Sequence, residues 1–527
     1  MRRANLLAII MFASLSLWQA LAARAQVVVW QPGQTSFPKV ETEPAAATVT
    51  GEQLPPSLKP LKISPAPEPI PALKYRFWVS PSLRKPGDAM AAVLQAQIAY
   101  LAHPERARLD AVYAENSNAK KNWLEMPLVE LADSGVPEFL SQHRDILNQV
   151  YLATELSTIP PADTSRLPRG MAAISGLVTE VQNNRSFARL IILDARLAIA
   201  EKRFDVAIDR IAAGFRLAEL THDGSPPTML TRLVSIAISG MMLDAVEELS
   251  QQPEAPNLYW ALASLPSSLW DLRSTLDGEA ASMSRVVYPL LEPISAGIDE
   301  REANQRLIEV ARAFAAAQGD PFEGDPFEGV AYAAGPAAQQ LDVTVASRLL
   351  AGLVVLAFAD ASLQELPELG YSQIDDLSDS EATLRAIQLG FQRGRDNLFK
   401  WVSTPGGIGG EWLAEMNWVA GGPQFLRPAN IMLGQLIPAL QASESAAMRV
   451  NSQHKQLLLR EALRAYAAEN AGNLPASIES LQPLPAWPNP VSGEMFLYER
   501  LNEQTAVVRR EALYPGEKQT DVRVEIR

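Results

Sequence analysis

Carboxylates with apolar neighbours are the first residues in this sequence that could do chemistry. Asp194 and Glu201 are seven residues apart in helical sequence, so both are expected on one helix face, beside Ile191 and Ala198. A buried carboxylate in such surroundings can have a raised pKa and act as a general acid. The simpler interpretation is an ion pair with an arginine from a neighbouring helix. Asp194 is therefore a candidate residue of a polar core.

A second group of charges follows Trp270. Asp271 and Arg273 stand two residues apart, and Asp277 and Glu279 come shortly after them. Such a run is typical of an ion-paired helix start, where acidic side chains accept hydrogen bonds from free backbone N–H groups. Asp271 and Arg273 join Asp194 as candidate polar-core residues, and none of the three is predicted to be catalytic.

Paired glutamates with aromatic neighbours follow a glycine-rich loop. Glu411 and Glu415 are one helical turn apart, beside Trp412 and Trp418. Sugar-cleaving sites use paired carboxylates, but two glutamates on one helix face are common without any such role. The preceding GGIGG loop lacks the lysine and the strand–glycine–helix context of a nucleotide site.

A tandem copy of five residues, GDPFEGDPFEG, occupies positions 319–329. Its four carboxylates could hold calcium weakly if they lay in one loop; they are Asp320, Glu323, Asp325 and Glu328. The flanking prolines and glycines favour a plain surface insertion instead.

Several residue types and motifs are missing. The chain has no cysteine, which excludes disulfides, thiolate metal sites and cysteine nucleophiles. Its four histidines, none at the i, i+4 spacing of a helical metal pair, are His103, His143, His222 and His454. No Gly-x-Ser-x-Gly, HExxH or Walker sequence occurs. We therefore predict no catalytic, cofactor-binding or metal-binding residue.

The N-terminus reads as a secretory signal. Arg2 and Arg3 supply the positive end, residues 6–18 the apolar run, and Ala23-Arg24-Ala25 a cleavage site before Gln26. The alternative is an uncleaved anchor, because residues 4–23 carry no charge and are just long enough to span a bilayer. Either way we expect export to the periplasm or cell envelope of a bacterium. Removing residues 1–25 leaves 43 basic against 60 acidic residues, which disfavours nucleic acid as a partner.

Four regions are expected: a signal peptide (1–25), a proline-rich tether (26–86), a helical body (87–425), and a long helix with a small β-containing tail (426–527). The tether holds twelve of the 39 prolines, and Phe77 and Trp78 are placed to dock on the body. Periodicity predicts helices over 89–103, 171–181, 186–221 (as a hairpin), 229–249, 349–359, 376–399 and 428–470, with two more in 123–156. The helices at 229–249 and 349–359 are apolar enough to be buried. Strands are expected at 495–501 and 505–509, with an edge strand at 522–526. The fold class is mainly α, an irregular helical bundle with a small α+β C-terminal segment.

The hairpin over 186–221 resembles a tetratricopeptide repeat unit. Its small and apolar positions match at Ala195, Phe204, Ala207, Ile211 and Gly214. No second copy follows 34 residues later, which implies one repeat-like hairpin rather than an array.

The C-terminal part is similar to the carboxyl-terminal half of pseudopilin-like proteins. Residues 472–481 read GNLPASIESL and residues 490–498 read PVSGEMFLY, while that family's N-terminal processing site and anchor helix are missing. With the signal, the tether and the segment PNLYWALASLP (256–266), the whole chain resembles a family of uncharacterised exported helical proteins of planctomycete bacteria. That resemblance implies no known activity.

We expect a non-catalytic module of the cell envelope that binds a protein or peptide partner, with the oligomeric state open. Most of the sequence has a helical pattern, and no group of residues in it matches a catalytic motif, which supports this expectation. The alternatives are a hydrolase of envelope polymers with carboxylates drawn from several helices, and a secretion or assembly component suggested by the tail.

Overall fold

The structure is a computed structural model. It describes residues 61–104, 123–161, 171–276, 278–279, 298–317, 343–402, 428–482, 484–490, 492–510 and 520–527. It is mainly helical with a small C-terminal sheet, as predicted. The chain divides into two compact units. The larger unit comprises Lys59–Val286, Asn397–Met416 and Leu436–Arg527, and the smaller one Met1–Leu58, Val287–Asp396 and Asn417–Gln435. These units do not follow the expected boundaries at residues 87 and 426.

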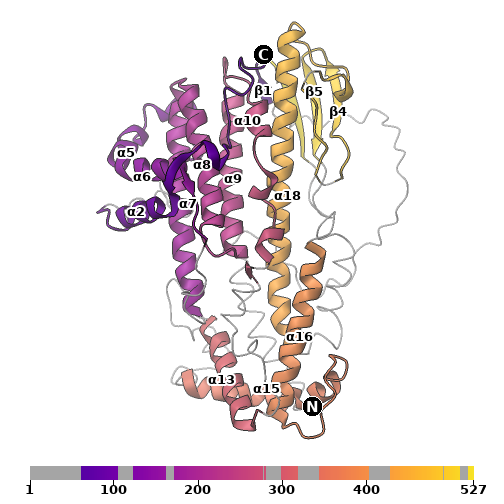
Figure 1. Ribbon diagram of the computed structural model, residues 1–527. Coiled ribbons are helices and arrows are strands. Elements are labelled where there is room, and N and C mark those ends of the chain that lie inside the picture. Colours follow the sequence, from indigo (N-terminus) through magenta and orange to yellow (C-terminus); the bar gives the residue numbers. More distant parts are fainter. Residues whose placement is uncertain are drawn as a thin grey trace. The chain divides into compact units, whose positions relative to one another are not determined.

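Three long helices form the centre of the larger unit. They are α7 (Met171–Ala200), α8 (Phe204–Asp223) and α9 (Met229–Ser250), which lie side by side and contact one another (Figure 1). Gly214 of α8 lies so close to α9 that a Cβ there would stand 2.0 Å from the sulfur of Met242. The small residue is therefore required by helix packing.

Helix α7 is continuous, whereas the sequence predicted a break between residues 181 and 186. Asn183 and Asn184 stand at that point and are buried, and the Asn184 side chain accepts a hydrogen bond of 3.0 Å from Gln97. A partner from another helix thus lets the polar stretch stay helical inside the unit.

Helix α9 is the one described helix with the length and hydropathy of a membrane span, and 67% of its most apolar window is buried in the unit. This agrees with the predicted buried helix. A capping box between Thr228 and Thr231 begins it.

An outer layer covers one side of this centre. It consists of α2 (Ala89–Leu101), α4 (Leu128–Leu131), α5 (Val136–Gln142) and α6 (Arg144–Glu155). Asp88 caps α2 as predicted, because its carboxylate accepts from the backbone N–H groups of Met90 (2.9 Å) and Ala91 (3.1 Å). Strands β2 (Lys85–Asp88) and β3 (Leu156–Thr158) pair in parallel beside them. Short helices complete the larger unit: η1 (Pro81–Leu83), α10 (Tyr259–Ala263) and η3 (Ser267–Leu269).

Residues 61–86 correct the expected tether, because they pack on the larger unit instead of extending from it. Strand β1 (Leu61–Ile63) joins the C-terminal sheet. Phe77 is 2% exposed and its ring lies 5.4 Å from that of Phe215. The predicted docking of Phe77 is thus confirmed. The backbone N–H of Trp78 donates a 3.2 Å hydrogen bond to the Ser264 hydroxyl.

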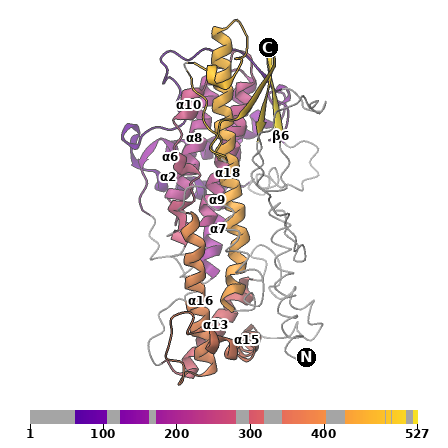
Figure 2. The same cartoon turned by 90° about the vertical axis from the view of Figure 1, so that its right-hand side faces the viewer.

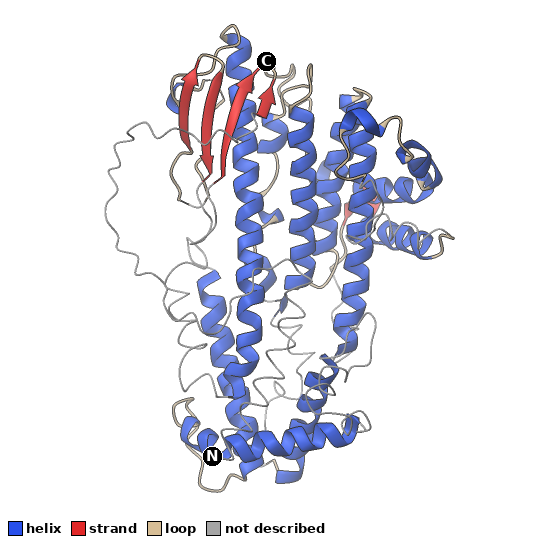
Figure 3. Cartoon of the chain, turned by 180° about the vertical axis from the view of Figure 1, so that it is seen from behind, coloured by secondary structure: helices blue, strands red, loops and turns tan. Residues whose placement is uncertain are grey.

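The tail begins with α18 (Pro428–Glu469), followed by η6 (Ile478–Ser480) and a four-stranded sheet. Its strands are β4 (Leu497–Asn502), β5 (Thr505–Arg510) and β6 (Thr520–Ile526), in the order β1-β6-β5-β4. They lie along the C-terminal end of α18 (Figures 2 and 3). The expectation of β6 as an edge strand is wrong, since β1 pairs with it in parallel on its outer side.

The smaller unit contains α13 (Glu300–Ala317), α15 (Val343–Glu365) and residues 379–396 of α16 (Asp379–Val402). Helix α15 is only partly buried, contrary to the prediction. Ala351, Phe358 and Ala359 are buried, but Leu349 is 56% and Leu356 is 65% exposed. Buried Glu381 and Arg385 of α16 form an ion pair of 2.7 Å.

Candidate functional site

Asp194 of α7 is buried in an ion-paired cluster. Its carboxylate accepts a 2.7 Å hydrogen bond from the Tyr151 hydroxyl and lies 2.9 Å from Arg210 Nε and 3.5 Å from an Arg144 nitrogen. The Arg210 guanidinium also lies 4.1 Å from the centre of the Tyr151 ring. Burial, and then the negative charge of Asp194, raise the pKa of Tyr151 well above its ordinary value. The predicted pairing of Asp194 with arginine is confirmed.

Glu201, predicted on the same helix face, follows the end of α7 and is exposed. It pairs with Arg203 two residues later. The two carboxylates therefore serve separate local contacts and do not form a site.

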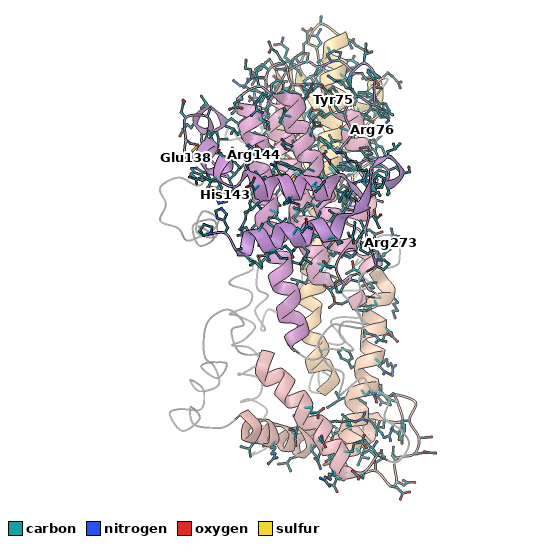
Figure 4. The ribbon with its side chains drawn as sticks, turned by 60° about the vertical axis from the view of Figure 1, so that its left-hand side comes forward. Tyr75, Arg76, Glu138, His143, Arg144 and Arg273 are labelled. Atoms are coloured by element: carbon teal, nitrogen blue, oxygen red, sulfur yellow. The ribbon has the colours of Figure 1, made fainter. Side chains whose placement is uncertain are left out.

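Asp271 and Arg273 form the ion-paired helix start that the sequence indicated. The two side chains approach to 2.6 Å, and the Asp271 carboxylate also accepts from the Arg273 N–H at 2.9 Å. Burial alone would raise the pKa of Asp271, but the hydrogen bonds and charge of Arg273 lower it overall. Arg273 and Arg144 lie well apart in Figure 4. The three candidate polar-core residues therefore do not converge on one centre.

Glu279 has a structural role in the same region. Its carboxylate accepts a 2.6 Å hydrogen bond from the backbone N–H of Met229, the first residue of α9. Burial raises the pKa of Glu279. The remaining predicted positions lie outside the described residues: Ala25 and Gln26, Asp277, the GDPFE carboxylates, and Glu411 with Glu415.

Buried arginines, which the sequence analysis missed, hold the larger unit together. Arg464 and Glu461 of α18 are fully buried and pair at 2.9 Å. The Arg464 guanidinium donates in addition to the backbone carbonyls of Ser64, Ala255 and Pro256 at 2.9, 2.7 and 3.2 Å. One side chain thus joins α18 to the segment after β1 and to the loop before α10. Arg464 stands in a regular helical sequence, which does not indicate this role.

Arg196 of α7 does similar work. It forms two bonds with Glu248 of α9, at 2.7 and 2.8 Å, and donates to the carbonyls of Trp123, Leu124 and Met126. Because all these donors have acceptors inside the protein, none of this charge is available to a substrate.

Two histidines that are distant in the sequence meet in the structure. The rings of His103 and His143 lie 4.5 Å apart, and His143 also contacts Phe139. The sequence spacing had given no indication of this. Within the described ranges, however, no group of three or more histidine, aspartate or glutamate side chains could hold a metal ion.

The smaller unit has an open groove of about 620 Å³ beside α13 and α15. Its lining includes Glu300 and Glu309, with Arg301 and Arg348. The glutamates are nine residues apart on α13, or about 13.5 Å along the helix axis. Sugar cleavage needs carboxyl groups about 5 to 9.5 Å apart. This groove therefore does not fit a glycoside-cleaving pair.

A second open groove, of about 330 Å³, lies in the larger unit between residues 65–75 and 254–257. It is called the proline groove below, after the rings of Pro65, Pro67, Pro69 and Pro256 in its walls. Three contacts fix the wall: the Ala66 N–H donates to the Arg464 carbonyl (3.1 Å), Asn257 donates to the Ala66 carbonyl (3.2 Å), and Trp260 donates to Glu68 (2.5 Å). The groove is thus held by the buried arginine network beneath it.

Glu254 lies at the proline groove with its backbone in an energetically unfavourable conformation. Its φ is 66°, a left-handed value that favours glycine or asparagine. Its side chain is exposed and has no hydrogen bond or ion pair with any described residue. A strained backbone that presents a free carboxylate is a pattern associated with functional sites.

The charges of the proline groove are predominantly negative. Glu68 and Glu254 face one cation, Lys74, which itself lies 3.7 Å from Asp205. The Tyr75 hydroxyl donates to the same Asp205 carboxylate at 2.8 Å, and Figure 4 shows Tyr75 beside Arg76 on this part of the unit. The groove therefore combines apolar rings with a lining that carries two carboxylates and one ammonium group.

Comparisons with protein-family models, curated proteins and solved structures find no match to this chain.

Proposed function

We propose that this chain is an exported protein of the bacterial cell envelope that binds a protein partner without catalysis, through the proline groove. The observation that carries the proposal is Glu254, held at positive φ on the rim of a groove with proline walls, where its carboxylate has no ion-pair partner among the described residues.

The proposed ligand is an extended peptide segment that carries arginine next to an apolar residue. Proline has no N–H, so the proline-rich wall offers ring surfaces and carbonyl acceptors rather than donors. A guanidinium is planar, weakly hydrated and rich in donors, and it suits both the apolar rings and the carboxylate of Glu254. Ile70, which is 94% exposed beside the groove, adds an apolar contact.

Catalysis is disfavoured because the buried charged side chains are bound to other groups of the protein. Asp194, Arg196 and Arg464 are engaged in ion pairs and bonds to backbone carbonyls within the protein. An assembly role for the tail has less support, because α18 is tied into the larger unit through Arg464 and through a 3.0 Å ion pair between Arg460 and Glu247.

Binding is tested with an immobilised peptide, Ac-Leu-Arg-Leu-Arg-Leu-NH2, and a second peptide in which citrulline replaces arginine. Citrulline keeps the shape and removes the charge. The mature chain should bind the arginine peptide, and Glu254→Gln should weaken that binding at least about tenfold, which corresponds to loss of a charged hydrogen bond. Asp133→Asn, at an exposed carboxylate elsewhere, is the matched control. Equal binding of both peptides would contradict the proposal.

Glu254→Gly separates a binding role from a structural one. Glycine relieves the positive φ, so the free energy of unfolding should stay unchanged or rise by up to about 1 kcal/mol. Peptide binding should nevertheless fall as it does in Glu254→Gln. A loss of stability would mean that the glutamate side chain supports the fold.

Export is tested by cell fractionation and by the intact mass of the chain recovered from the envelope. A mass that corresponds to a chain starting at Gln26 indicates cleavage after Ala25. A full-length mass in the membrane fraction supports the anchored alternative, and a cytoplasmic full-length chain would contradict export.

A further inference from the structure

The outer face of α2 is apolar and carries no charge. Leu94 is 56%, Ile98 58% and Leu101 44% exposed, and Ala91 on the same face is exposed as well. No charged residue occurs from Ala89 to Ala102. Soluble proteins seldom leave a whole helix face in this state unless something packs on it.

The spacing of these four side chains is that of a two-helix seam. Ala91, Leu94, Ile98 and Leu101 are separated by three, four and three residues, which is the alternation of positions a and d in a heptad repeat. The occupant that this spacing favours is another α-helix that packs nearly parallel or antiparallel to α2.

The seam is complementary to itself when a second copy runs antiparallel. Pairing about a twofold axis level with Ala96 places Leu94 opposite Ile98 of the second copy, and Ile98 opposite its Leu94. In the outer layers Ala91 meets Leu101, so that a small residue faces a large one at each end. The flanking exposed residue Gln95 is neutral, and no like charges oppose each other across the seam.

The inner face of α2 fixes the helix for such a contact. Ala89, Ala92 and Val93 are buried in a cluster with Ala153 and Leu220. The Gln97 side chain donates to Asn184 at 3.0 Å, and the Tyr100 ring lies 5.6 Å from that of Phe187. Because the inner face holds α2 in place, its outer face is presented rigidly and can be changed without loss of the fold.

We infer that two copies of this chain associate through α2, antiparallel, with Leu94 and Ile98 in the two central layers. The contact is short, since 13 residues of helix span about 20 Å. The dimer is therefore expected to depend on protein concentration. It should also strengthen with salt, because each mature chain carries 43 basic residues against 60 acidic ones and the two copies repel each other.

The absence of cysteine from the chain permits a direct test of the register. Leu94→Cys and Ile98→Cys are made as separate mature full-length proteins and mixed under mild oxidation. The mixture should form a cross-linked dimer, whereas each protein alone should cross-link far less, because equivalent residues are offset by four positions, about 6 Å along the axis. Leu83→Cys, at an exposed leucine outside α2, is the control.

A second measurement keeps the inference testable without cross-linking. Sedimentation velocity should show a dimer for the wild-type chain that is lost in Leu94→Glu/Ile98→Glu, with a dissociation constant raised at least about tenfold. Leu83→Glu should leave the dimer unchanged. A wild-type chain that stays monomeric at high concentration and salt would overturn the inference. Faster cross-linking of Leu94→Cys alone than of the mixture would overturn the antiparallel register and with it the proposal.

Discussion

His454 of α18 should make the stability of the larger unit depend on pH. The side chain is 2% exposed, and its Nε2 lies 2.9 Å from the carbonyl oxygen of Leu262, so Nε2 is the donor. The Trp270 ring lies 5.1 Å away. Burial lowers the pKa of His454 to about 4, outweighing the bond to Leu262, and the charge of Lys455 lowers it further.

The size of the effect follows from proton binding in the two states. An unfolded histidine has its ordinary pKa of about 6.5, so below that pH the unfolded chain takes up a proton that the folded chain refuses. The contribution of His454 to the free energy of unfolding is therefore fully present above pH 7, and it is lost as the pH falls from 6.5 toward 4. Between pH 7.5 and pH 5.0 the loss from His454 alone is about 2 kcal/mol.

Urea denaturation of wild type and His454→Gln at these two pH values measures this loss. Glutamine keeps an N–H donor for Leu262 but does not titrate. Buried carboxyls with raised pKa values, such as Asp244 and Glu444, act in the opposite direction and are common to both proteins. The wild type should lose about 2 kcal/mol more than the variant. A difference below about 0.5 kcal/mol would refute the assignment of a buried, neutral His454.

Two further substitutions test the packing of the larger unit. Arg464→Met leaves the Glu461 carboxylate buried without its partner and should lower the free energy of unfolding by about 3 to 5 kcal/mol. A urea titration measures this loss. The double variant Arg464→Met/Glu461→Met should recover part of it. Gly214→Ala forces a Cβ against Met242 and should cost about 1 to 3 kcal/mol, seen as a lower midpoint of thermal unfolding. An unchanged midpoint would show that Met242 moves aside freely.

Elements with local signals could be predicted from the sequence. Helix α2 begins at the capping residue Asp88, α8 has a regular apolar face, and the β4–β5 hairpin shows alternating text around a short turn. In each case the residues that determine the element lie within or next to it. The pairing of Asp194 with an arginine was also foreseeable, since a buried carboxylate needs a partner.

Elements that depend on distant partners could not be predicted. Strand β1 has only three residues, and its partner β6 lies more than 450 positions later. Arg464 binds backbone carbonyls, and because every residue has a carbonyl the sequence does not show which ones it will bind. The positive φ of Glu254 is likewise invisible in the sequence, where Pro253 and Pro256 indicate only a loop. The candidate binding site was therefore missed, while most of the helices that support it were found.

The parallel pair of β1 with β6 has a consequence for how the chain matures. During synthesis β1 emerges more than 450 residues before its hydrogen-bonding partner β6. The pair therefore cannot form until β6 has been made, and loops that join such distant segments form slowly. The same pairing makes β1 depend on β6, so that removal of β6 would also leave Leu61–Ile63 without its partner strand.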